Sequence, residues 1–145
     1  MPLIEESVVI RAPRESIWEF AAQPDNVTVW QSNLIEFELL GRPPVRVGSE
    51  GRGAVRVAGR TMRCTQTATT WVANETVTWS STDSPIDFTY TASYRVVPGG
   101  TEVTVHVETG PLGTFFGNIA DPVVARMYAH DVTSNLAQLK ALMEG

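Results

Sequence analysis

Hydrophobic and polar residues alternate with a period of two over most of this chain, which is typical of β-strands. The first such segment covers residues 3–11, where Val8, Val9 and Ile10 favour an extended chain. Further segments follow after residue 33, separated by glycine and proline, and we expect strands over 34–40, 45–57, 61–71, 76–82, 86–96 and 103–107. Seven strands joined by short turns predict a mostly antiparallel sheet with one apolar face.

A helical period replaces the alternation shortly after the first strand. Pro13 suits the first turn of a helix, where its missing N–H has no partner to lose, and Trp18 belongs to the apolar stripe that follows. Pro24 ends this helix, and Asp25 is expected to cap a second helical turn that runs toward Trp30. We therefore predict two short helices between the first and second strands.

The second helical pattern lies at the C-terminus, over residues 112–143. Asp121-Pro122 inside it signals either a kink or a restart of the helix. Beyond this point one apolar stripe recurs at helical spacing and comprises Ala125, Tyr128, Val132, Leu136, Leu139 and Met143. A sheet and a long helix with one apolar face each predict an α+β fold in which the sheet wraps around the C-terminal helix.

Length and charge narrow the class of protein. The 145 residues fit one domain, 1–145, and the net charge is −5. The eleven cationic residues are scattered, and only Lys140 is a lysine, so a nucleic-acid partner is not expected. The N-terminus lacks a secretory signal pattern, and no apolar run approaches ~18 residues, so we expect a cytoplasmic protein without membrane insertion.

The sequence predicts neither a metal site nor a cofactor. Cys64 is the one cysteine, which excludes an internal disulfide and a zinc site built on several cysteines. His106 lies with Glu108 on the polar side of its strand, where a surface position is the simpler interpretation. His130 and Asp131 are consecutive, so a helix points them about 100° apart, which is poor for joint metal binding.

The order of these elements resembles the START-like (SRPBCC) superfamily with its helix-grip fold, and most closely its polyketide cyclase/dehydrase and lipid-transport-like branch. The segments that carry the resemblance are Ala12-Pro13 with Ile17-Trp18, Trp30, Val47-Gly48, Val77-Thr78-Trp79, the hairpin over 94–103 and the closing 136–140. The resemblance implies a seven-stranded antiparallel sheet around a long C-terminal helix, with two short helices between strands one and two. It also implies a deep pocket for apolar or amphipathic small molecules and no shared catalytic residues.

A cavity of this kind is also expected to be occupied. Leaving ~300 Å³ empty costs ~7 kcal/mol on the scale of core-cavity mutants. That cost rivals the whole stability of a small domain, ~5–15 kcal/mol. Water or a ligand is therefore expected to fill such a space.

Candidate ligand contacts follow from strand parity and from the helix stripe. The strand residues predicted to face inward with polar or aromatic groups are Gln66, Trp79, Phe88, Tyr90 and Tyr94, beside the smaller Met62, Cys64, Ala68 and Val77. The helix adds Tyr128 and Asn135 on its inner stripe and Asp131 at the edge of that stripe. The resemblance implies a position at the pocket mouth for Trp30, which is either a structural residue or a lid contact, and Phe116 with its neighbour Phe115 provides a candidate gate.

Several of these residues have a second interpretation. Gln66 is either a hydrogen-bond anchor for a ligand oxygen or a strand-end residue whose amide reaches water. Tyr90 and Tyr94 are either ligand contacts or core residues that send their hydroxyls to the surface. Asp131 is either a solvated helix flank or, if buried, an acid or base with a raised pKa.

Three functions are consistent with this pattern. The leading prediction is binding of a hydrophobic or aromatic small molecule, such as a lipid or polyketide-like compound. A cyclase or dehydratase is the second, for which ionisable groups such as Asp131 and Tyr90 or Tyr94 have to converge in the cavity. The third is a protein-interaction module of the chaperone-regulator type, and a homodimer is left open.

Overall fold

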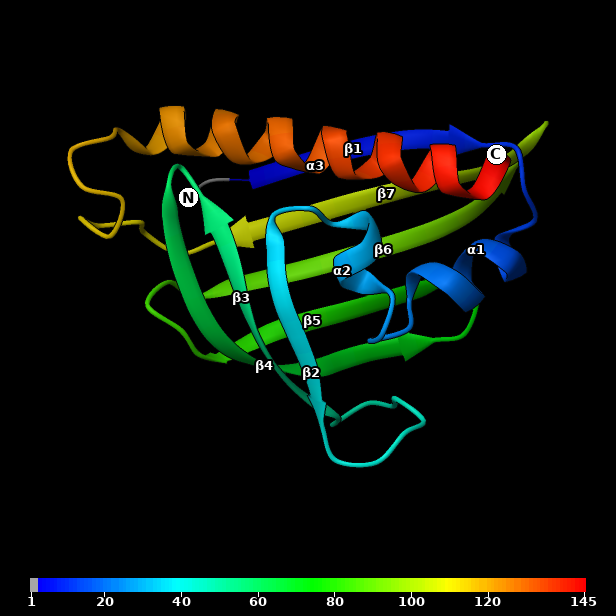
Figure 1. The fold of residues 1–145 in the computed structure, drawn as a ribbon, viewed down its shortest axis with the longest axis horizontal. Coiled ribbons are helices and arrows are strands. Elements are labelled where there is room, and N and C mark those ends of the chain that lie inside the picture. The colour runs from blue at the N-terminus through cyan, green and yellow to red at the C-terminus, as the bar shows by residue number, and fades with distance from the viewer. Residues whose placement is uncertain (1–2) are drawn as a thin grey trace.

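Seven antiparallel strands form one sheet in the order β1-β7-β6-β5-β4-β3-β2 (Figure 1). The computed structural model describes residues 3–145. The strands are β1 (Leu3–Ile10), β2 (Leu34–Leu40), β3 (Glu50–Val57), β4 (Arg60–Val72), β5 (Thr76–Asp83), β6 (Phe88–Val97) and β7 (Gly100–Thr109), and the helices are α1 (Arg14–Ala21), α2 (Val27–Trp30) and α3 (Asp121–Glu144). This is the predicted helix-grip arrangement, which is therefore confirmed.

The sheet is strongly curled. In Figure 1, β2 and β3 are steeply inclined, whereas β5, β6 and β7 run nearly horizontally below α3. α3 buries Val132, Leu136 and Leu139 and so covers the inner face with the predicted apolar stripe. None of the helices within residues 3–145 is long and apolar enough to cross a membrane.

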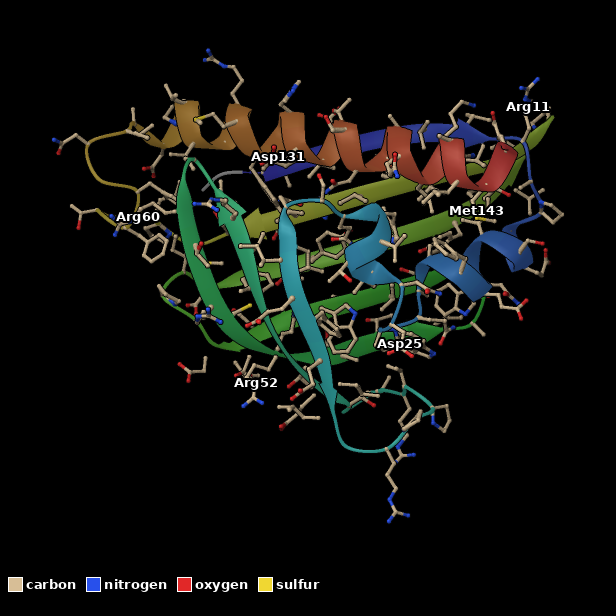
Figure 2. All side chains as sticks on the ribbon, in the orientation of Figure 1. Arg11, Asp25, Arg52, Arg60, Asp131 and Met143 are labelled. Carbon is tan, nitrogen blue, oxygen red and sulfur yellow. The ribbon has the colours of Figure 1, made fainter. Side chains whose placement is uncertain are left out.

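The C-terminal end of α3 is fastened to the end of β1. Lys140 Nζ donates to Val9 O at 2.8 Å, and the Arg11 backbone N–H donates to Glu144 Oε2 at 2.8 Å. Arg11 and Met143 lie at the same end of the molecule (Figure 2). The hydrogen bond from Lys140, together with that from Arg11, lowers the pKa of Glu144 to about 2. The grip is thus held by polar contacts at this end.

Three predicted boundaries are wrong. The strand expected over 45–57 begins only at Glu50, because the chain first makes a turn in which Ser49 N–H donates to Arg46 O at 3.0 Å. The helix expected from 112 begins only at Asp121, so Asp121-Pro122 marks the start of the helix and not a kink within it. Asp25 does not cap α2, since Asn26 occupies the N-cap position.

The segment between β7 and α3 is non-helical for a local reason. Gly113 and Gly117 have φ of +59° and +74°, which a right-handed helix does not contain. Pro122 then lies in the first turn of α3, where it costs no backbone hydrogen bond. Two apolar residues of this loop, Leu112 and Phe116, turn inward and are buried.

The buried apolar side chains form two clusters. The larger lies under α1, α2 and the C-terminal half of α3 and includes Trp18, Trp30 and Leu136. The smaller gathers residues of β3, β4, the β5–β6 connection, the segment before α3 and the first turn of α3, namely Val57, Met62, Ile86, Leu112, Phe116 and Val124. The partly buried Tyr128 packs against both. The core therefore consists of two clusters, and the site described below is lined by residues of both.

Candidate functional site

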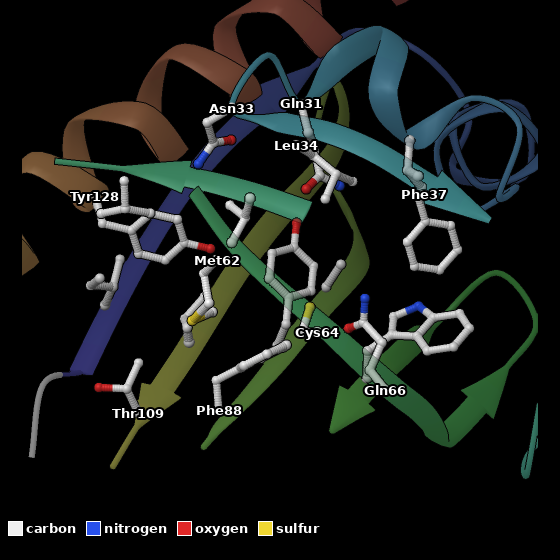
Figure 3. Close-up of a pocket in the computed structure, with 18 of the residues that line it drawn as sticks. Gln31, Asn33, Leu34, Phe37, Met62, Cys64, Gln66, Phe88, Thr109 and Tyr128 are labelled. Carbon is white, nitrogen blue, oxygen red and sulfur yellow. The ribbon is translucent and has the colours of Figure 1, made fainter. Parts of the chain in front are cut away.

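A cavity of about 130 Å³ is lined by residues of both apolar clusters. Its walls come from the inner face of the sheet, from α1 and α2 with the chain that follows, from the segment before α3, and from the first turns of α3. Most of the lining side chains are aliphatic or aromatic. Figure 3 draws 18 of the residues that surround the space.

The sheet supplies the wall through alternate residues of β4, β5 and β6. Gln66, Trp79, Phe88, Tyr90 and Tyr94 all line the cavity. Alternation brings them to one face, because successive side chains of a strand point to opposite sides of the sheet. Trp79 and Tyr90 are direct neighbours on β5 and β6. The five side chains thus lie on the same face of the sheet.

Gln66 is an interior residue of this wall. It pairs with Gly51 on one side and Ser81 on the other, and its exposed fraction is 7%. The interpretation of Gln66 as a strand-end residue reaching bulk water is therefore wrong. Figure 3 shows its amide pointing into the space opposite Phe37.

The segment before α3 contributes Phe116. This ring is 8% exposed and lines the cavity, whereas the neighbouring Phe115 ring lies edge-on to it at 5.0 Å and is covered from outside by the Arg60 guanidinium at 5.5 Å. Adjacent aromatic residues thus separate into one inner and one outer ring. The helix adds Tyr128, whose hydroxyl points into the space (Figure 3).

Trp30 lines the cavity but does not lie at its mouth. Its exposed fraction is 1%, and its indole Nε1 donates to Ala21 O at 3.1 Å. The indole bridges the end of α1 and the end of α2, because a buried Trp N–H needs an acceptor. The interpretation of Trp30 as a lid contact at the entrance is therefore wrong, and the alternative, a structural residue of the wall, agrees with this burial.

Asp131 does not line the cavity. It borders an outer groove together with Arg126 and His130, because one residue along a helix turns the side chain about 100° away from the buried Val132. Partial burial raises the pKa of Asp131, and His130 opposes that effect. The hypothesis that Asp131 converges with Tyr90 or Tyr94 inside the cavity is not supported.

Asn135 is buried yet also lies outside the cavity. Its Oδ1 accepts from Ser32 N–H at 3.0 Å and from Ser32 Oγ at 3.2 Å, while its Nδ2 donates to Asn33 Oδ1 at 2.8 Å. The predicted ligand contact therefore ties α3 to the chain that leaves α2. The helical stripe predicted Asn135 on the inner side of α3 but contained no signal for its partners.

The ionisable groups of the cavity wall within the described residues are Cys64, Tyr90, Tyr94 and Tyr128. Burial raises the pKa of all four. The neighbouring phenols also raise the pKa of Tyr90, and a backbone hydrogen bond to Gly53 partly offsets the shift of Cys64. All four groups are consequently neutral near pH 7, and the wall carries no charge there.

Among residues 3–145, two buried side-chain polar atoms of the wall have no hydrogen-bond partner. Asn33 Nδ2 and Thr109 Oγ1 are buried and unpaired, and both residues line the cavity. Neither residue was predicted from the sequence. Asn33 lies just before β2, where parity makes no prediction, whereas Thr109 shares the parity of the inward Val107 but lies beyond the end of the predicted strand. A buried polar group without a partner costs about 1–3 kcal/mol, so an occupant that bonds to it is favoured.

All three tyrosines of the chain line this cavity, so tyrosine ionisation reports on the site alone. Their pKa values are raised above 10.0 in the native protein, so their burial stabilises the fold below pH 10 and that contribution is lost as the pH rises further. We expect no tyrosinate absorbance from native protein at pH 10, where the denatured chain is half ionised. If the tyrosines of the native protein titrate near pH 10, they are not buried in an uncharged cavity wall and this description of the site is wrong.

Within residues 3–145, no group of three or more His, Cys, Asp or Glu side chains is arranged to hold a metal ion. His106 instead lies 3.9 Å from Glu108 on the outer side of β7.

Comparison with known proteins agrees with this geometry. The family model described as polyketide cyclase / dehydrase and lipid transport matches residues 1–144. No curated protein matches the sequence.

Solved structures share the fold over nearly the whole chain. A protein from Thermus thermophilus is 17% identical with a TM-score of 0.81, over 97% of this chain and 95% of its own. The Zhui aromatase/cyclase from Streptomyces sp. R1128 is 15% identical with a TM-score of 0.77, over 98% and 93%. A START superfamily protein from Mycobacterium smegmatis is 14% identical with a TM-score of 0.75, over 98% and 97%. At these identities the likeness concerns the fold alone.

Proposed function

We propose that this chain, which belongs to the polyketide cyclase/dehydrase and lipid transport family, binds an uncharged and largely apolar small molecule in the cavity between the sheet and α3. The ligand class is a lipid or polyketide-like compound with at least one polar group. The eight predicted contacts that line the cavity are Trp30, Gln66, Trp79, Phe88, Tyr90, Tyr94, Phe116 and Tyr128.

The observation that carries this proposal is the chemical character of the wall. Apolar and aromatic side chains dominate it, and its ionisable groups are neutral near pH 7 because burial raises their pKa values. An ionised ligand loses its hydration on entry and finds no opposite charge there, which is costly. The wall therefore favours a neutral ligand with a large apolar surface.

Binding is a better match to this wall than acid–base catalysis. A general acid or base works best with a pKa near the operating pH. The raised pKa values of Tyr90, Tyr94 and Tyr128 move these phenols away from neutrality, and Asp131 borders the outer groove instead. Neutral phenols can contact and hydrogen-bond a bound ligand, but they are poorly suited to transfer protons near pH 7.

Filling the cavity from the sheet tests the proposal. Cys64 lies on the inner face of β4, between Met62 and Gln66. In Cys64→Phe, the added ring is expected to occupy the cavity and to weaken binding of the neutral fluorophore N-phenyl-1-naphthylamine by about tenfold or more, which is at least ~1.4 kcal/mol. Fluorescence titration measures this, and native mass spectrometry of the wild type searches for a co-purified molecule.

The matched control is Thr65→Phe, which puts the same ring on the opposite face of the same strand. This variant is expected to bind the fluorophore as the wild type does. Thermal unfolding checks that both variants fold, and Cys64→Phe is expected to keep or gain stability because it fills a void. If Cys64→Phe binds the fluorophore with the same affinity as the wild type, the cavity is not the binding site.

A further inference from the structure

The structure assigns a hydrogen-bond polarity to one end of the cavity. We propose that Asn33 presents an N–H donor to the ligand, that Asn135 holds it in that orientation, and that the ligand therefore carries a neutral acceptor, such as a ketone or other carbonyl oxygen, at this end. The inference rests on the proposed function, since it names the ligand chemistry of the same cavity.

The orientation of both amides follows from one backbone group. The Ser32 N–H can only donate, so the atom of Asn135 at 3.0 Å from it has to be the oxygen, Oδ1. The Nδ2 of Asn135 consequently points the other way and donates to Asn33 at 2.8 Å. Since Nδ2 can only donate, the receiving atom of Asn33 is its Oδ1. Each step leaves one arrangement.

The remaining atom of Asn33 is therefore its Nδ2, a group with two N–H donors. This atom is buried and has no partner, and the side chain belongs to the cavity wall (Figure 3). Asn33 cannot rotate its oxygen toward the cavity without placing Nδ2 against Nδ2 of Asn135. The donor is thus held in place by a residue of another element.

Asn135 is a positioning residue in this arrangement. It is 5% exposed and lies on α3, whereas Ser32 and Asn33 lie on the chain between α2 and β2. The two bonds from Ser32 hold its amide from one side, and the bond to Asn33 transmits that orientation. Helix α3 thereby determines which atom of Asn33 is left for the ligand.

The acceptor is expected to be neutral. The ionisable groups around the cavity are three phenols and one thiol with raised pKa values, so a carboxylate has no cationic partner on the wall. A carbonyl oxygen accepts from Asn33 without that desolvation cost.

Three bicyclic probes of nearly equal shape separate the possibilities. Indene is apolar, indole carries only a donor, and 1-indanone carries only an acceptor. Affinities for the full chain are measured by calorimetry or by ligand-observed NMR. For each variant, every dissociation constant is divided by that of indene for the same variant. This ratio corrects for changes in cavity size or protein stability that affect all three probes equally. The wild type is expected to prefer 1-indanone to indole by about fivefold or more.

The decisive variant is Asn135→Asp, a replacement of one nitrogen by oxygen. An ionised aspartate at this position accepts from Ser32 with one oxygen and can only accept with the other, so the affinities are measured at a pH at which the carboxyl is ionised. Asn33 then rotates its Nδ2 toward residue 135 and turns its Oδ1 to the cavity. The preference is expected to invert, so that indole binds about fivefold or more better than 1-indanone. A purely structural role of Asn135 predicts no inversion.

Asn33→Leu provides the second variant, in which the donor is lost and nothing replaces it. The affinity of this variant for 1-indanone is expected to fall to its affinity for indene, and its affinity for indole relative to indene is expected not to rise. Asn74→Asp in the β4–β5 turn is the matched control for the added charge and is expected to behave as the wild type.

The outcomes distinguish the two proposals. If none of the probes binds the wild type, the proposed function fails and this inference falls with it. If the probes bind but a folded Asn135→Asp or a folded Asn33→Leu keeps the wild-type preference, the polarity assignment is wrong while ligand binding stands. Circular dichroism establishes that each variant is folded, and either variant alone suffices for the test.

Discussion

Replacing Trp30 with alanine is expected to lower the free energy of unfolding by about 3–5 kcal/mol, the range for removing a large buried aromatic residue. The indole is 1% exposed and belongs to the larger apolar cluster. Its Nε1 also donates to Ala21 O at 3.1 Å, so the alanine variant leaves a buried carbonyl without this partner. Since small domains are stable by only ~5–15 kcal/mol, this loss is large.

Urea denaturation of wild type and variant measures the effect on Trp30. The control is Trp30→Phe, which keeps an aromatic ring and removes the Nε1 donor. We expect it to lose less than half as much stability as the alanine variant. If Trp30→Ala costs less than about 1 kcal/mol, a typical value for any point mutation, the indole is not a structural wall of the cavity.

The second large effect is expected at Gly100, the first residue of β7. A Cβ atom there lies 2.1 Å from Ile10 O, which belongs to the backbone at the end of β1. A backbone oxygen cannot move aside as a side chain does, so Gly100→Ala has to displace β1 or the β6–β7 hairpin. The neighbouring Thr101, fully buried, then risks its hydrogen bond to Ala12 O at 2.8 Å.

We expect Gly100→Ala to cost about 3–4 kcal/mol, since overpacking and a broken buried hydrogen bond act together. The preceding glycine is the control. Gly99 has φ of +86° and open space around its Cβ position, so Gly99→Ala pays only for left-handed backbone, about 1–2 kcal/mol. Thermal and urea unfolding of both variants are compared. Equal losses at the two positions contradict the close contact between Gly100 and Ile10.

Strand parity explains how much of the site was predictable. Gln66, Trp79, Phe88, Tyr90 and Tyr94 were assigned to the inner face from alternation alone, and the structure places all five on the cavity wall. A strand has only two faces, so one buried residue determines the side of its neighbours. Whether these side chains bind a ligand remains a prediction.

Helix residues were harder to assign, because a helix offers a continuous range of directions. Tyr128 lines the cavity, but Asn135, further along the same stripe, lies beyond it against the chain after α2. Asp131 is less than one turn from Tyr128 and borders the outer groove. The helical period predicts which side of α3 is buried. Which neighbouring element a buried residue contacts depends on its position along the helix axis, and the period does not predict this.

Asn33 and Thr109 were missed for a different reason. Asn33 lies in the connection before β2, where neither period applies. Thr109 is the last residue of β7 and shares the parity of the inward Val107, but it lies beyond the end of the predicted strand. Their importance comes from burial without a partner, which depends on the elements packed around them.

The sequence by itself determined the order of strands and helices, the single curled antiparallel sheet and the apolar side of each element, since these follow from periodicity and from local backbone preferences. Only the tertiary structure decided where the core divides into two clusters, which groups remain neutral on the cavity wall, and which way the Asn33 amide points. The physical reason is that desolvation and hydrogen-bond pairing depend on neighbours about 100 residues apart in the chain, such as Ser32 and Asn135.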